Sequence, residues 1–121
     1  MESVSLFVKH RIGANELVLT GRLDMEQVLT LESEIVKEVD EHPEPICAIN
    51  LTKLGYIDTS GLSLLLRLRE YMEKTNQVLL LFGANINVLS IIKMARLEKV
   101  LQTINEGSFY VEYPLKDPFA L

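Results

Sequence analysis

The chain has 121 residues and a formal net charge of −5, because 17 acidic residues outnumber 12 basic ones. Its apolar fraction of 48% is enough for the buried core of one domain, and the acidic balance argues against general nucleic-acid binding. A single cysteine excludes an intramolecular disulfide framework, and no signal peptide or apolar run of about 20 residues is present, so we expect a cytoplasmic protein without a membrane span.

The first part of the chain is typical of a β-hairpin. Residues 3–10 alternate loosely between apolar and polar side chains, as in a half-buried strand. Residues 11–15 contain a glycine and an asparagine, which favour a turn, and residues 16–21 form a second alternating run.

A helix is predicted to follow Asp24 and to run to about residue 41. Apolar side chains recur at spacings of three and four, which places them on one face: Val28, Leu31, Ile35 and Val39. Asp24 is expected to cap the start of this helix, and Pro43 and Pro45 to follow its end.

The rest of the chain alternates short apolar runs with helical periodicity. We expect, in chain order, a buried strand, a helix, a second buried strand, a third helix and a last short strand, over residues 46–51, 62–74, 77–82, 85–96 and 101–104. The order β-β-α-β-α-β-α-β predicts one α/β domain over residues 3–121, with a mixed sheet of four to five strands flanked by helices. Residues 106–121 show no clear pattern and are expected to be irregular.

The sequence offers little for catalysis, metal binding or cofactor binding. None of the six glycines forms a phosphate-cradling loop. His10 and His42 have no Cys or His partner at metal-ligand spacing, so we expect ordinary polar residues rather than a metal site. Cys47 lies in an apolar run and is expected to be a buried, unreactive thiol. We therefore expect a protein that is not an enzyme and that has no cofactor.

One tetrapeptide, Asp58-Thr59-Ser60-Gly61, follows a predicted buried strand and opens a helix. Helix capping alone would select these residue types. A second interpretation is a hydroxyl presented at a helix start, where phosphorylation would add roughly −1.5 to −2 charges. The aspartic-protease signature Asp-Thr-Gly is interrupted here by Ser60 and occurs once, whereas that chemistry needs two such carboxylates.

Two segments resemble motifs of the STAS domain, and specifically of bacterial anti-sigma factor antagonists. Residues 19–24 read LTGRLD, which is similar to the family's L-x-G-x-L-D. Residues 57–62 read IDTSGL, which is similar to its D-[ST]-[ST]-G-L loop. The resemblance covers about residues 3–105 and implies a STAS-like fold.

The resemblance also implies a mechanism. In that family the hydroxyl after the loop aspartate, here Thr59, is phosphorylated by an anti-sigma factor that is also a serine kinase. The unphosphorylated antagonist binds this kinase and releases its sigma factor, phosphorylation switches binding off, and a phosphatase restores it. Asp58 matches the family's loop aspartate and Ser60 its second hydroxyl, while Asp24 matches the acid that closes the first motif. Ser60 is the second choice of phosphoacceptor after Thr59.

Helix periodicity suggests where a partner could bind. In the predicted helix over residues 62–74, Leu62 and Leu66 fall opposite the sheet-facing arc, among charged residues. Leu89, in the next helix, also lies off its expected core face. These leucines, with Asp24 and the loop from Asp58 to Gly61, form the predicted partner surface, although a broadly buried helix would give the same pattern.

A STAS module can also serve as a subunit of a larger assembly. The alternative to an antagonist is a STAS subunit of a lipid-transport ABC complex, or of a sensory or scaffold assembly. A neighbouring anti-sigma kinase gene would favour the first reading, and a neighbouring permease and ATPase the second.

Overall fold

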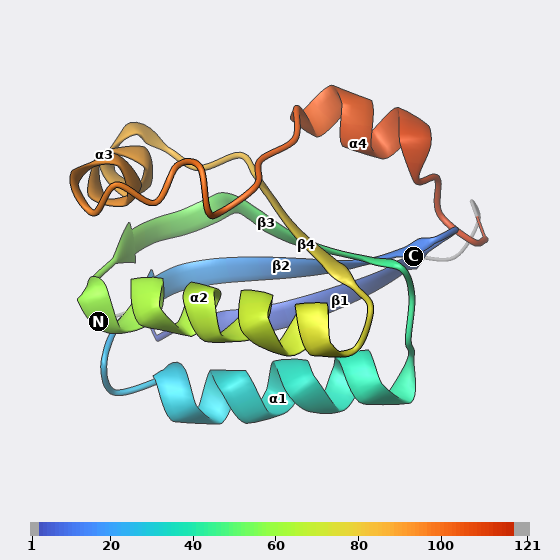
Figure 1. Ribbon diagram of the computed structural model, residues 1–121, viewed down its shortest axis with the longest axis horizontal. Coiled ribbons are helices and arrows are strands. Elements are labelled where there is room, and N and C mark those ends of the chain that lie inside the picture. The colour runs from blue at the N-terminus through green and yellow to red at the C-terminus, as the bar shows by residue number, and fades with distance from the viewer. Residues whose placement is uncertain (1–2, 118–121) are drawn as a thin grey trace.

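The structure, a computed structural model that describes residues 3–117, contains one mixed sheet with the strand order β1-β2-β3-β4 (Figure 1). Strands β1 (Ser5–Arg11) and β2 (Ala14–Leu23) pair antiparallel, which confirms the predicted hairpin. Strands β3 (Ile46–Ile57) and β4 (Val78–Phe82) run parallel to β2. Gly13 permits the hairpin turn, because its φ of 83° is a conformation that other residues rarely adopt.

Two long helices cover one face of the sheet, α1 (Val28–Glu41) and α2 (Thr59–Lys74) (Figure 1). The predicted core face of α1 is confirmed, since all four of its members are buried: Val28, Leu31, Ile35 and Val39. They pack with the inward side chains of β2 and β3 into the main hydrophobic cluster.

The start of α1 differs from the expectation. The helix begins at Val28, three residues later than the predicted start after Asp24, and its N-cap Gln27 makes no side-chain capping hydrogen bond. Asp24 is therefore not the cap. Its Oδ1 accepts a hydrogen bond from the Glu26 backbone N–H at 3.1 Å, so it stabilises the turn before the helix instead.

The opposite side of the sheet carries α3 (Ile86–Met94) and α4 (Glu106–Glu112) (Figure 1). The segment from residue 106 was expected to be irregular, and this is wrong for its first seven residues. Phe109 is fully buried and stacks on Phe82, with ring centroids 4.9 Å apart. Phe109 is the buried residue of this short helix. A single buried position shows no hydrophobic periodicity, so the sequence pattern did not indicate a helix here. Residues 118–121 of the predicted segment lie outside the described part.

The α/β class and the order of elements are as predicted, but the last expected strand is short. Over residues 101–104 the chain forms a single parallel bridge between Leu81 and Thr103. Two backbone hydrogen bonds support it, both to the edge of β4. Within residues 3–117, no helix combines the length and apolar character needed to cross a membrane.

The parallel strands bring three loops to one edge of the sheet. The carboxyl ends of β2, β3 and β4 lead to Asp24, Asp58 and Asn85 respectively. Because carboxyl ends of parallel strands meet at the same edge, these loops gather there. This edge is at the left of Figure 1, where α2 begins, and it holds the candidate site.

Candidate functional site

Asp58 connects two of these loops through its carboxylate. Its backbone is extended, and its Oδ1 accepts a hydrogen bond from the Gly61 N–H at 3.0 Å, which caps α2. Its Oδ2 accepts from the Met25 N–H at 3.3 Å, in the loop after β2. The capping interpretation of this residue is confirmed, and the same side chain fixes the β2–α1 loop beside the start of α2.

Gly61 allows α2 to start in close contact with the sheet. A Cβ added there would lie 2.6 Å from Ile57 Cγ1 and 2.9 Å from the Leu23 carbonyl oxygen. Since one of these contacts is to backbone, a side chain would push the helix start away. The glycine of the DTSG sequence therefore sets the position of the two residues before it.

Thr59 is the first residue of α2 and its side chain is exposed, as the sequence predicted. Ser60, the second hydroxyl, is half-buried. A phosphate on Thr59 would meet two opposing fields. The positive end of the α2 dipole favours negative charge, whereas the neighbouring Asp58 carboxylate opposes it.

The leucines predicted on the partner surface are less accessible than expected. Leu62 is 5% exposed and belongs to the main core cluster, so the expectation that it faces a partner is wrong. The reason is that α1 lies beside α2 (Figure 1), so α2 buries a wider arc than a single sheet-facing stripe. Leu66 and Leu89 are half-buried, which leaves part of each side chain accessible.

Apolar side chains that are well exposed do occur at this edge. Met25 is 72% exposed and Ile86 73%, in the loop after β2 and at the first turn of α3. Met25 was not predicted as part of this surface. The sequence placed it in the helix predicted after Asp24, whereas α1 begins at Val28 and leaves Met25 in the preceding loop. The bond from its backbone N–H places Met25 beside Asp58, the residue before Thr59.

Two further predictions concern the histidines and the cysteine. Cys47 is buried as expected, and burial raises the pKa of its thiol to about 12. Folding brings His10 and His42 together, with ring centroids 4.5 Å apart, a proximity that their spacing in the sequence did not indicate. They are 32 residues apart in sequence, beyond the spacing of any local motif.

The sequence profile of the STAS domain matches residues 8–107, which include both motifs. The chain belongs to the STAS domain family. Comparison with curated proteins gives no match.

Solved structures of STAS proteins have the same fold. The unphosphorylated anti-sigma factor antagonist SpoIIAA has a TM-score of 0.72 at 19% identity, over 91% of this chain and 96% of SpoIIAA. An anti-sigma factor antagonist from Mycobacterium paratuberculosis has a TM-score of 0.72 at 20% identity, over 84% and 85% of the two chains. A sulfate transporter family protein from Wolinella succinogenes has a TM-score of 0.67 at 15% identity, over 84% of each chain.

Proposed function

We propose that this STAS domain is an anti-sigma factor antagonist of a bacterial cytoplasm, controlled by phosphorylation of Thr59. Its unphosphorylated form binds an anti-sigma factor that is a serine kinase and so releases a sigma factor. Phosphorylation by that kinase switches binding off, and a phosphatase reverses it. The domain acts by binding, without catalysis of its own. The observation that carries the proposal is the exposed Thr59 hydroxyl at the start of α2, held in place by Asp58 and Gly61.

The surroundings of Thr59 suit a contact surface that a phosphate would disrupt. Met25 and Ile86 present exposed apolar surface on the same edge. Burying such side chains against a partner is favourable, at about 25 cal/mol per Å² of apolar area. A phosphate on Thr59, at the same edge, would have to lose its hydration in such a contact, and it would add bulk and negative charge beside Asp58.

The switch does not require unfolding of the domain. The first turn of α2 stabilises a negative group through the helix dipole, typically by 0.3–1 kcal/mol at exposed sites, so about that much offsets the repulsion from Asp58. Support comes from the shared fold with SpoIIAA, whose structure is known in both the unphosphorylated and the phosphorylated form. The phosphate on this chain would thus act mainly at the partner contact.

The test is phosphorylation of the full chain by its cognate anti-sigma kinase with ATP, followed by mass mapping of the phosphosite. We expect one phosphate on Thr59. Thr59→Ala should abolish incorporation, and the matched variant Ser60→Ala should retain it. Incorporation that persists in Thr59→Ala and is lost in Ser60→Ala would move the switch to Ser60. No incorporation into wild type would contradict phosphorylation control.

A second candidate function is a STAS subunit of a membrane transporter or of a sensory assembly. The structural likeness to the sulfate transporter family protein supports this second candidate. Purification of the chain from its own host separates the two. Co-purification with a kinase of the anti-sigma type supports the antagonist, whereas co-purification with a permease and an ATPase supports the transport subunit.

A further inference from the structure

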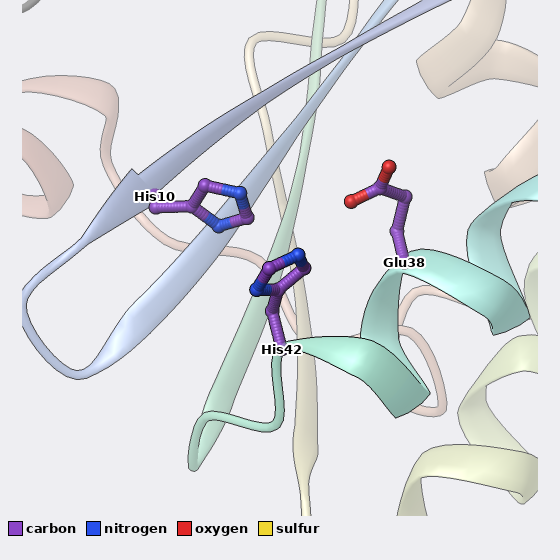
Figure 2. Close-up of side chains that lie close together, drawn as sticks. All are labelled: His10, Glu38 and His42. Carbon is purple, nitrogen blue, oxygen red and sulfur yellow. The ribbon is translucent and has the colours of Figure 1, made fainter.

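A cluster of metal-ligating side chains lies far from Thr59 in the fold. Figure 2 shows His10, from β1, facing Glu38 and His42, from the last turn and the C-cap of α1. One ligand atom of each residue lies within 4.8 Å of those of the other two. Glu38 and His42 are four residues apart, so the helix presents them on one face. His10 and Glu38 are half-buried and His42 is exposed.

Asn15 orients His10 for ligation. The Asn15 side-chain amide donates from Nδ2 to the His42 backbone carbonyl, which can only accept. Its Oδ1 therefore faces His10 and accepts a hydrogen bond from His10 Nδ1 at 2.9 Å. His10 Nδ1 thus holds the proton, and Nε2 keeps a lone pair. Metal-binding histidines typically have such a partner on the second ring nitrogen. Asn15 is only 2% exposed, so this orientation is held by the core.

The electrostatics of this corner favour a cation. The C-terminal end of a helix carries partial negative charge. The last turn of α1 contains no basic residue, while Glu38, Asp40 and Glu41 all lie in it. The whole chain also carries a net charge of −5. A divalent ion at this end would therefore gain from the helix, the local carboxylates and the overall charge.

We propose that His10, Glu38 and His42 form a binding site for a divalent first-row transition metal ion, with Zn²⁺ as the ion to test. Two imidazoles and one carboxylate are a donor set that suits zinc. In a tetrahedral site with bonds of about 2.0–2.1 Å, ligand atoms lie about 3.4 Å apart, so small side-chain rotations would close this cluster on an ion. Three protein ligands leave the fourth position to water or to a group from another molecule.

This proposal is independent of the proposed function. The site is at the carboxyl end of α1, whereas Thr59 is at the start of α2, at the other end of the helical layer (Figure 1). Thr59→Ala should bind zinc like wild type, so failure of the phosphorylation model and failure of the metal site are separable. Cys47 does not compete as a ligand, because its thiol is buried and its pKa is raised to about 12.

The test is calorimetric titration of ZnCl₂ into the full chain, without a histidine tag and after treatment with a chelator. We expect one saturable site per chain. Three variants should each weaken zinc binding by about 10-fold to 100-fold or more: His10→Ala, His42→Ala and Glu38→Gln. Removal of a group that only orients a metal ligand already costs about 10-fold to 100-fold in affinity, so loss of a ligand itself should cost at least as much. The matched control is Glu34→Gln, an exposed acid one turn earlier on α1 with the same change of charge, and it should bind like wild type.

A second measurement uses wild type alone and is independent of whether the variants fold. Zinc should shift the ¹⁵N resonance of His10 Nε2 in the NMR spectrum. His10 Nδ1 should keep its proton and its hydrogen bond to Asn15 Oδ1. Coordination through Nδ1, binding that survives loss of both histidines, equal weakening in Glu34→Gln, or the lack of any saturable binding would each overturn the proposal.

Discussion

Replacement of Asp58 by alanine tests how the phosphorylation loop is built. The change removes the α2 cap, which accepts from the Gly61 N–H at 3.0 Å, and the longer contact to the Met25 N–H at 3.3 Å. Loss of an N-cap costs about 1 kcal/mol. Loss of the second, exposed hydrogen bond adds about 0.5 kcal/mol. We expect Asp58→Ala to lower the free energy of unfolding by about 1.5 kcal/mol, or the Tm by about 6 °C for a chain of this size.

Asp58→Asn is the matched variant, because its amide oxygen can still cap α2 while its NH₂ group cannot accept from the Met25 N–H. Amide hydrogen exchange resolves the two contacts. Exchange should accelerate at both Gly61 and Met25 in Asp58→Ala, and at Met25 alone in Asp58→Asn. Equal acceleration at Gly61 in the two variants, or a Tm for Asp58→Ala within about 1 °C of wild type, would refute the double role of this carboxylate.

Three more predictions concern a buried ion pair, the thiol and the charge at Thr59. Glu16 is fully buried and pairs with Arg11 at 2.7 Å. Arg11→Ala leaves this carboxylate without its ion-pair partner, so it should lower the free energy of unfolding, measured with urea, by about 3–5 kcal/mol. A decrease below about 1 kcal/mol would contradict this. Cys47 should resist a thiol reagent at about pH 8 until the chain unfolds, since burial raises its pKa to about 12; rapid labelling of the folded protein would contradict its burial. Thr59→Glu should change the Tm by less than about 3 °C, because the added charge lies at a helix N-terminus; a drop of about 10 °C would mean that the charge acts by unfolding.

Local patterns predicted the parts of the fold that local physics controls. The α1 core face follows from spacings of three and four, and the hairpin follows from two alternating runs around Gly13. The loop from Asp58 to Gly61 was located for the same reason, since capping and a close helix start each require a specific residue type. The exposed position of Thr59 follows directly from its place after the cap.

Features that depend on contacts between distant segments were not predictable in this way. Leu62 is buried because α1 packs beside α2, which the period of α2 alone does not show. The short α4 depends on Phe109 reaching Phe82 from 27 residues away. The pairing of His10 with His42 requires the end of β1 to meet the end of α1. Each case needs the sheet to be assembled before the contact exists.

The most direct test of the antagonist model measures the affinity of the cognate anti-sigma kinase for the chain before and after stoichiometric phosphorylation. We expect tight binding of the unmodified chain and at least a 100-fold loss on phosphorylation, which corresponds to about 2.7 kcal/mol. Thr59→Glu should reproduce much of this loss, and Ser60→Glu less of it. Equal affinity of the phosphorylated and unphosphorylated chains would contradict the model.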